Sequence, residues 1–209
     1  MEPCNISKAL MRRLPLYLNH LKSLPGEDGN ISATSIANTL GLGHVLVRKD
    51  LAKISGEGRR RTGRSRQQLI RDIETYLDYA STTTTVVVGT GMLGQALLDY
   101  RGFEESGLNV LAGFDSQPAL KQSDSGKPIY PMSRLSSFCK LYNVRIGIIT
   151  VPAEKAQAVC DNLIACGVQA VWNFTPARLT VPKGMILQNE NWAVSGSNLR
   201  MQLKNRETD

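Results

Sequence analysis

A glycine-rich loop is the part of this sequence whose residue types and spacing are best suited to hold a phosphate group. Gly89, Gly91 and Gly94 stand in the order G-x-G-x-x-G, directly after the apolar run Thr85–Val88 and before a helical stretch. In a strand–turn–helix, the first glycine permits the tight turn, the second lets the backbone approach a pyrophosphate, and the third allows close packing of helix against strand. Free N–H groups at the start of the helix then face the phosphates. The motif predicts a dinucleotide-binding loop.

An acidic residue follows at the distance expected for the ribose of such a ligand. Asp115 ends the next apolar run, 108–114, about 20 residues after the glycine motif. A carboxylate at this position accepts hydrogen bonds from both ribose hydroxyls of adenosine and repels a 2′-phosphate, so NAD(H) is favoured over NADP(H) as the cofactor. The alternative is a glycine-rich turn in a domain that binds no nucleotide.

Two further loops are expected at the same edge of the sheet. Thr150, Val151 and Pro152 end one buried strand, and Phe174 follows the next strand. Ligands of open α/β sheets lie at the carboxyl ends of the strands, so these residues are expected to bound the nicotinamide end of the site. Phe174 could equally be a core residue, and Pro152 the first residue of a helix. With the loops included, the expected site comprises Gly89, Thr90, Gly91, Met92, Leu93, Gly94, Asp115, Thr150, Val151, Pro152 and Phe174.

Alternating strand and helix patterns must position these residues. Strands are expected at 85–88, 108–114, 128–130, 144–150, 168–173 and 185–189, and helices at 95–100, 135–142 and 154–166. This alternation predicts an α/β domain with a parallel, Rossmann-type sheet. The polar residues 81–85 mark its boundary with the part of the chain that precedes it.

The preceding part of the chain has helical periodicity. Apolar residues recur at helical spacing over residues 5–24, where Pro15 would divide the helix into two pieces unless a helix begins there. Ser32 is expected to cap a helix that runs to about Leu40, and the glycine-containing turn 41–43 leads into a second helix at 44–54. This order predicts a helix-turn-helix. The buried side of the second helix is expected to carry Val45, Val47, Leu51 and Ile54, and a further helix is expected to end near Tyr79.

The positive charge of the chain is concentrated in this region. Residues 40–71 hold nine cations and two anions, and their net charge of +7 equals the formal net charge of the whole chain. Such a block indicates a polyanionic partner, and the alternative is a charged face that contacts only water. A recognition helix and a glycine-rich wing are expected to contact DNA through His44, Arg48, Lys49, Lys53, Arg59, Arg60 and Arg61.

The remaining features exclude several classes of protein. The apolar runs are far shorter than a membrane span, and the N-terminus lacks an apolar signal core, so a cytoplasmic protein is expected. The four cysteines, Cys4, Cys139, Cys160 and Cys166, form no metal-like C-x-x-C pair and are expected to be reduced and mostly buried. Both histidines precede the nucleotide region, so no proton donor for a substrate carbonyl is apparent there. We therefore expect a sensor without catalytic residues or a metal.

These segments resemble the Rex family of redox-sensing transcriptional repressors over nearly the whole chain. In the first half, the similarity is carried by Arg13-Leu14-Pro15-Leu16-Tyr17, Arg48-Lys49-Asp50-Leu51 and the glycine-rich wing. In the second half, it is carried by residues 88–98, Gly102-Phe103, Phe114-Asp115, Thr150-Val151-Pro152-Ala153 and Asn173-Phe174.

The resemblance implies a winged-helix DNA-binding domain at residues 1–80, a Rossmann NAD(H)-binding domain at 81–189 and a C-terminal segment at 190–209 that forms a helix swapped onto the partner of a homodimer. It also implies that the dimer binds double-stranded operator DNA, that NAD⁺ permits this binding and that NADH releases it. Two alternatives stay open, a Rex-like regulator that has lost or changed its nucleotide sensing and a small NAD-dependent oxidoreductase.

The resemblance further implies a switch of three residues. In the family, an aspartate pairs alternately with a tyrosine near the cofactor and an arginine of the DNA domain, and the corresponding residues here are Asn191, Tyr100 and Arg13. Tyr100 thereby joins the expected nucleotide site. Asn191 is neutral, so it can form a hydrogen bond but no ion pair. The following Ser195-Gly196-Ser197-Asn198 is a poor helix interior, so the switch is the feature in which this chain is expected to differ most from the family.

Overall fold

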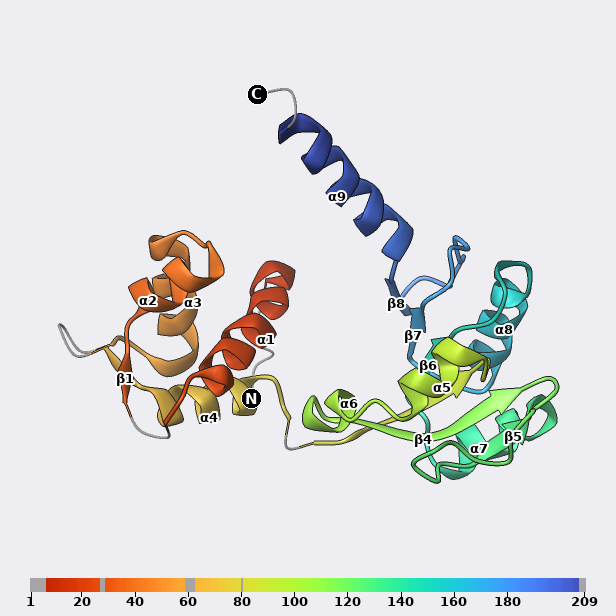
Figure 1. Ribbon diagram of the computed structural model, residues 1–209. Helices are drawn as coiled ribbons and strands as arrows, with labels where there is room; N and C mark the ends of the chain where they lie inside the picture. Colours follow the sequence, from red (N-terminus) through yellow and green to blue (C-terminus); the bar gives the residue numbers. More distant parts are fainter. Residues whose placement is uncertain (1–6, 27–28, 59–62, 80, 207–209) are drawn as a thin grey trace. The chain divides into compact units, whose positions relative to one another are not determined.

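Two structural units divide the chain, unit 1 over residues 1–81 and unit 2 over residues 82–209. The computed structural model describes residues 7–26, 29–58, 63–79 and 81–206 (Figure 1). Of the residues expected to contact DNA, Arg59, Arg60 and Arg61 lie outside the described residues, as does Cys4. Each unit is described by itself below.

The described part of unit 1 contains α1 (Lys8–Ser23), β1 (Asn30–Ile31), α2 (Ala33–Leu40), α3 (His44–Ser55), β2 (Arg64–Ser65) and α4 (Arg66–Tyr76). Helix α1 begins where the Ser7 hydroxyl accepts a hydrogen bond from the N–H of Leu10 at 3.2 Å. It continues through Pro15 as one helix, so the division that the proline made possible does not occur. Leu14 and Leu18, on either side of the proline, are fully buried, and this packing offsets the backbone hydrogen bond that proline cannot donate.

Helices α2 and α3 form the predicted helix–turn–helix. The Ser32 hydroxyl caps α2 by accepting from the N–H of Ser35 at 3.0 Å, and Gly41 ends α2 with a φ of 63°, a left-handed conformation that favours glycine. In α3, Val47 and Leu51 are buried as expected, but Val45 is 58% exposed, which corrects its assignment to the core. Helix α4 ends at Tyr76, three residues before the expected position.

Unit 2 is built on a six-stranded parallel sheet in the order β5-β4-β3-β6-β7-β8. Its strands are β3 (Thr83–Val88), β4 (Leu108–Asp115), β5 (Ile129–Pro131), β6 (Ile146–Ile149), β7 (Ala170–Asn173) and β8 (Ile186–Asn189). The helices are α5 (Met92–Leu98), α6 (Gly102–Glu105), the 3₁₀ helix η1 (Met132–Arg134), α7 (Leu135–Leu141), α8 (Ala153–Ala165) and α9 (Trp192–Arg206). Counted within unit 2, the third, second, first, fourth, fifth and sixth strands thus lie in this order, which is the Rossmann topology and confirms the predicted fold class.

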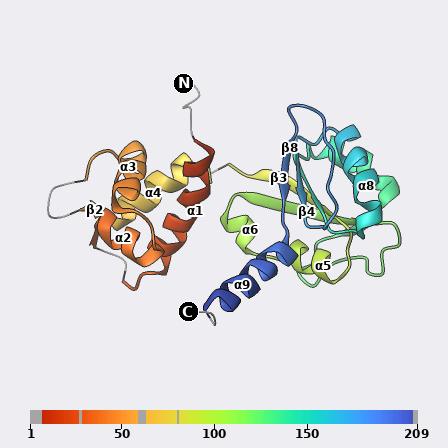
Figure 2. The same cartoon turned by 90° about the horizontal axis from the view of Figure 1, so that it is seen from above.

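Helices cover both faces of the sheet (Figure 2). Alternation along β3 shows why, since Val86 and Val88 pack into the core beneath α7 and α8, whereas Val87 packs into the core beneath α5 and α6. All three valines are essentially inaccessible to solvent. Because β3 is buried on both faces, the loop that follows its carboxyl end is held in a fixed position at the edge of the sheet.

Two helices of unit 2 compare differently with expectation, since α6 was not expected and α9 is the C-terminal helix that the resemblance implies. The short α6 was not predicted, because four residues are too few to show helical periodicity. The poor helix interior at 195–198 is nevertheless helical in α9, where the Asn191 side chain caps the first turn by accepting from the N–H of Val194 at 3.1 Å. The good helix formers of residues 199–204 follow it directly. All residues from Asn191 to Arg206 are exposed.

Candidate functional site

The glycine loop lies where the strand order of the sheet reverses, between the ends of β3 and β6. Gly89 adopts a φ of 97°, which a residue with a side chain rarely adopts. The Thr150 hydroxyl donates to the carbonyl oxygen of Gly89 at 2.7 Å, so the loop after β6 is bonded directly to the loop after β3. A Cβ placed on Gly94 would lie 1.8 Å from the same carbonyl oxygen, which explains why this turn of α5 contains glycine.

Asp115 holds the glycine loop against β4. One of its carboxylate oxygens accepts from the N–H of Thr90 at 2.7 Å and from the Thr90 hydroxyl at 3.2 Å, and the other accepts from the N–H of Gln117 at 3.1 Å. Burial alone would raise the pKa of Asp115, but the hydrogen bonds from Thr90 and Gln117 outweigh it and lower the pKa. The side chain is therefore an anion that is fixed in place before any ligand binds.

A cavity of about 580 Å³ opens above this edge of the sheet. It is lined by Val88, Gly89, Gly91, Asp115, Ser116, Met132, Thr150, Val151, Pro152, Lys155 and Val159. One of the two expected loops, Thr150–Pro152, thus meets Asp115 and the glycine motif in one space, which has an anion on one side and aliphatic walls. A volume of this size accommodates a nucleoside-sized ligand.

Five of the lining residues were not identified from the sequence. Met132 follows β5, and Lys155 and Val159 lie four residues apart on α8, so they share one face of that helix. Their types are unremarkable for a helix, and only the packing of α8 beside β6 brings them to the cavity. The helical spacing after Pro152 is the one feature that could have indicated them.

Other expected residues of the nucleotide site lie outside the cavity lining. Thr90 is buried against Asp115, and Met92 is 94% exposed. Leu93 and Gly94 lie in α5. The Phe174 ring packs at a tilt against Trp172, with a centroid distance of 5.0 Å, and edge-on against Trp192, with a centroid distance of 6.1 Å. The Thr150–Pro152 loop, which was expected at the nicotinamide end, shares its cavity with Asp115 and hence with the expected ribose position.

In unit 1, α3 presents its cationic side chains to solvent. His44, Arg48, Lys49 and Lys53 are all exposed on α3. The ion pairs found within the described residues do not involve any of them. The positive charge of Arg48, Lys49 and Lys53 is therefore available to a polyanion.

The opposite face of α3 is held by a buried carboxylate. Asp50 is 4% exposed and accepts from Nε and Nη2 of Arg13 at 2.7 and 3.0 Å and from the Tyr17 hydroxyl at 2.8 Å. The hydrogen bonds that Arg13 donates to Asp50 raise the pKa of Arg13. Burial, and then the hydrogen bond that the Tyr17 hydroxyl donates to Asp50, raise the pKa of Tyr17 to about 12. Arg13, an expected switch residue, therefore joins α1 to the recognition helix.

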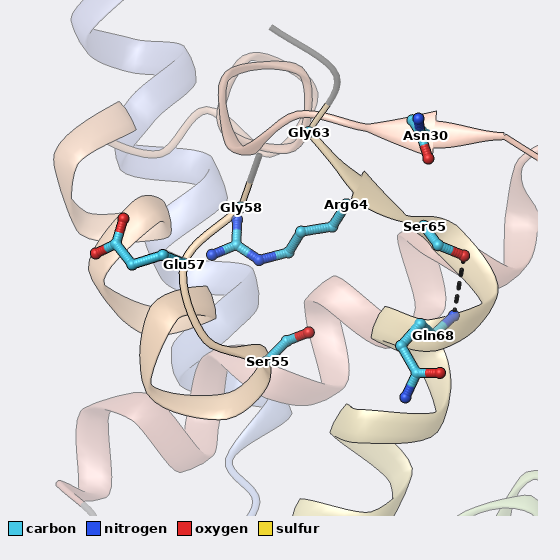
Figure 3. Close-up of a pocket in the computed structure, with 8 residues that line it drawn as sticks. All are labelled: Asn30, Ser55, Glu57, Gly58, Gly63, Arg64, Ser65 and Gln68. Carbon is cyan, nitrogen blue, oxygen red and sulfur yellow. Dashed lines mark hydrogen bonds between the residues drawn. The ribbon is translucent and has the colours of Figure 1, made fainter. Parts of the chain in front are cut away.

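Not every cation of the basic block faces outward. Arg64 extends from β2 across a polar cavity of about 440 Å³ toward Gly58, and it donates to the carbonyl oxygen of Gly56 at the end of α3 (Figure 3). Arg66 donates to the carbonyl oxygens of Leu24 and Pro25, each at 3.1 Å. These two arginines hold backbone segments of unit 1 together, so the charge that faces a polyanion is smaller than the sequence count indicates.

The two remaining switch residues lie in unit 2. Tyr100 is 57% exposed and packs edge-on against Phe103, with ring centroids 5.0 Å apart. Asn191 uses its side-chain oxygen to cap α9. In contrast to Arg13, the Tyr100 hydroxyl makes no hydrogen bond within the described part of the chain.

The described residues contain neither a metal-binding cluster nor a membrane-spanning helix. Among residues 7–26, 29–58, 63–79 and 81–206, there is no group of three or more His, Cys, Asp or Glu side chains arranged to hold a metal. Across the same residues, none of the helices has the length and apolar character needed to span a membrane. Cys139 and Cys160 are buried free thiols, and burial raises the pKa of each.

Known proteins combine the same two features. A family described as "CoA binding domain" matches residues 80–177, and one described as "Putative DNA-binding protein N-terminus" matches residues 5–52. The redox-sensing transcriptional repressor Rex of Porphyromonas gingivalis is 38% identical over 187 residues, which cover 88% of this chain and 85% of that protein.

Two solved structures of the repressor RSP match both units. The complex of RSP with β-NAD⁺ and operator DNA has a TM-score of 0.88 and 30% identity, and the match covers 99% of this chain and 96% of that chain. The complex of RSP with β-NADH has a TM-score of 0.84 at the same identity, and the match covers 99% and 98%. The chain therefore belongs to the Rex family of redox-sensing transcriptional repressors.

Proposed function

We propose that this protein is a transcriptional repressor that binds operator DNA and responds to the ratio of NADH to NAD⁺. The observation that carries the proposal is that one chain combines a recognition helix with exposed cations and a cavity at the reversal point of a dinucleotide-binding sheet. Such a protein acts in the cytoplasm, on the DNA, as a regulator rather than an enzyme.

In this proposal, α3 enters the major groove of double-stranded DNA. His44, Arg48, Lys49 and Lys53 contact base edges and phosphates, and Arg59, Arg60 and Arg61 of the wing reach phosphate or the minor groove. The exposure of the four residues on α3 supports this assignment. The Asp50–Arg13 pair fixes the orientation of α3 from behind.

The cavity of unit 2 holds the adenosine diphosphate part of NAD(H). Gly89 and Gly91 allow the pyrophosphate to approach the backbone, and the Asp115 carboxylate accepts hydrogen bonds from the ribose hydroxyls. The aliphatic side chains of Met132, Val151 and Val159 provide the apolar walls that an adenine ring requires. The nicotinamide extends toward Tyr100 and Phe174.

The functional unit in this proposal is a homodimer. Helix α9 exposes five large apolar side chains, Trp192, Val194, Leu199, Met201 and Leu203. Trp192, Leu199 and Leu203 lie on one side of the helix and Val194 and Met201 on the other. A helix of 15 residues is marginally stable in water without tertiary packing, so exposed apolar side chains on both sides favour a second copy of the chain as its partner. The swapped helix expected from the family accounts for this exposure.

Operator binding across an NADH titration tests the function. A DNA duplex selected from a random pool by the wild-type protein would be titrated without nucleotide, with NAD⁺ and with NADH. We expect NADH to weaken binding, and we expect Arg48→Ala and Lys49→Ala to weaken it by ~1–3 kcal/mol each. Lys121→Ala, which removes an exposed cation from unit 2, is the matched control.

Each remaining outcome supports an alternative. DNA binding that is insensitive to both nucleotides would indicate a regulator that has lost or changed its nucleotide sensing. Sustained oxidation of NADH by the pure protein would indicate an oxidoreductase. Binding of random and selected duplexes with equal affinity would contradict the repressor.

Asp115→Ala is expected to weaken binding of both NADH and NAD⁺ and to reduce discrimination against NADP(H). Charge-assisted hydrogen bonds to the ribose are worth roughly 1.5–3 kcal/mol each, so the dissociation constant should rise about tenfold or more. Calorimetry with all four dinucleotides measures this. Asp124→Ala removes an exposed carboxylate of the same unit and serves as the control. An unchanged affinity for NADH would exclude Asp115 from the site.

Asn191→Asp is expected to make the release of DNA by NADH more complete. A ligand shifts a two-state protein only by its differential affinity, and moving a population from 1:99 to 99:1 requires about 5.5 kcal/mol. An aspartate restores the charge-assisted contacts of a switch residue, and it also keeps the cap on Val194.

The fraction of operator that stays bound at saturating NADH is the quantity to measure. We expect this fraction to be larger for the natural chain than for Asn191→Asp. Asn198→Asp adds the same charge seven residues further along the chain, within α9, and should give the same fraction as the natural chain. Complete release by the natural chain, unaltered by the substitution, would show that Asn191 does not weaken the switch.

A further inference from the structure

The first turn of the recognition helix exposes an apolar side chain among its cations. Val45 is 58% exposed, although Val47 and Leu51 of the same helix are buried. Single exposed apolar side chains are common on protein surfaces. The position of Val45, rather than its exposure alone, therefore decides whether it has a role.

Helical geometry places Val45 at the centre of the outer face of α3. Successive residues of an α-helix are rotated by about 100°, so the buried residues Val47, Asp50 and Leu51 define the inner face, and Val45 points away from it. Val45 lies three and four residues before Arg48 and Lys49, which places the three side chains on one continuous surface. A polyanion that contacts these cations therefore also covers Val45.

The neighbouring Leu46 differs from Val45. It is 39% exposed, and the 100° rotation per residue places it at the flank of the helix. The helix thus presents one apolar side chain centrally and one laterally. Substitutions of Val45 and Leu46 can therefore be compared, because only Val45 lies at the centre of the outer face of α3.

An apolar side chain at this position has a specific counterpart in DNA. Residues at the start of a recognition helix reach base edges, and the only apolar group on a base edge in the major groove is the 5-methyl group of thymine. A β-branched side chain in a helix is held almost entirely in one rotamer, so ordering it against a methyl group costs little conformational entropy. Cationic side chains cannot recognise this methyl group, because the group of thymine that attracts them in the major groove is its carbonyl oxygen.

We propose that Val45 reads a thymine by contact with its 5-methyl group. This inference rests on the proposed function, in which α3 enters the major groove. Val45 is then a specificity-determining residue, while Arg48 and Lys49 supply most of the affinity. Removal of one buried methyl-sized contact corresponds to roughly fourfold weaker binding, that is ~0.8 kcal/mol.

The test removes the methyl group from each partner in turn. In the duplex selected by the wild-type protein, each thymine is replaced singly by deoxyuridine, which lacks the 5-methyl group and keeps its hydrogen-bonding edge. The dissociation constants of wild type, Val45→Ala and Leu46→Ala are then measured for every duplex. Val45 is exposed and alanine is the better helix former, so the variant is expected to remain folded, which thermal melting checks.

We expect one thymine of each half-site at which deoxyuridine weakens wild-type binding about fourfold. At this position, Val45→Ala should bind both duplexes equally, whereas Leu46→Ala should retain the fourfold difference. Equal sensitivity of wild type and Val45→Ala at every thymine would overturn the inference, as would a loss of sensitivity in Leu46→Ala alone. In those two cases the selected duplex still binds and the proposed function stands. Failure of the wild-type protein to bind any selected duplex would overturn the function and the inference together.

Discussion

Gly94→Ala is expected to destroy the nucleotide site by forcing α5 away from the sheet. The added methyl group would lie 1.8 Å from the carbonyl oxygen of Gly89 and 2.9 Å from the Thr150 hydroxyl oxygen. Both contacts are shorter than nonbonded atoms permit, and the first is with backbone that cannot rotate away. Overpacking usually costs 1–3 kcal/mol, and we expect more than ~3 kcal/mol in the unfolding of unit 2.

A neighbouring glycine provides the matched control. A Cβ on Gly91 would meet nothing within 4 Å, and its φ of −66° is available to any residue. Gly91→Ala should therefore leave the thermal stability unchanged and weaken NADH binding, because its methyl group occupies the space that the pyrophosphate approaches. Gly94→Ala should lose both properties. Equal stability of the two variants in denaturant unfolding would contradict the close packing of α5.

Asp50→Ala is expected to destabilise unit 1 by about 3–5 kcal/mol, since it removes one partner of a buried ion pair and leaves the other without compensation. The substitution would leave the guanidinium of Arg13, whose side chain is 18% exposed, and the hydroxyl of the fully buried Tyr17 without their acceptor. Because Asp50 lies in the recognition helix, operator affinity should fall together with the unfolding temperature.

An exposed ion pair of the same unit provides the comparison. Lys22 and Glu74 are separated by 2.8 Å, with side chains 45% and 33% exposed, and Glu74→Ala should cost less than ~1 kcal/mol. Calorimetric unfolding of both variants measures the difference. A loss in Asp50→Ala no larger than that in Glu74→Ala would show that Asp50 does not hold α1 to α3.

The parallel sheet and the glycine loop could be predicted because the necessary information is local. The strands of unit 2 are short apolar runs between helical patterns, and Gly89, Gly91 and Gly94 occupy a spacing that few other structures require. Asp115 was recognised by its distance from this motif. Its second role, as the acceptor that holds Thr90, depends on the register of β3 beside β4 and is absent from any sequence pattern.

The errors of prediction share a physical cause. Pro15 disfavours a continuous helix locally, but the leucines around it are buried by partners distant in the chain. Val45 is apolar and was therefore placed in the core, although the phase of α3 turns it outward. Arg64 belongs to the basic block, but it donates to the carbonyl oxygen of Gly56 within unit 1. In each case, tertiary packing decides between alternatives that residue type leaves equal.

In the proposed homodimer, the exposed apolar side chains of α9 make the stability of the protein depend on its concentration. The helix is about 22 Å long, and none of its side chains is buried within the chain. If its apolar side chains are covered only by a second copy, folding of this helix follows mass action, and the midpoint of thermal unfolding rises with protein concentration. Dilution of the protein then lowers its stability. In a cell whose protein concentration is below the dissociation constant of the dimer, the DNA and nucleotide units of each chain would be folded, but the chains would be monomeric.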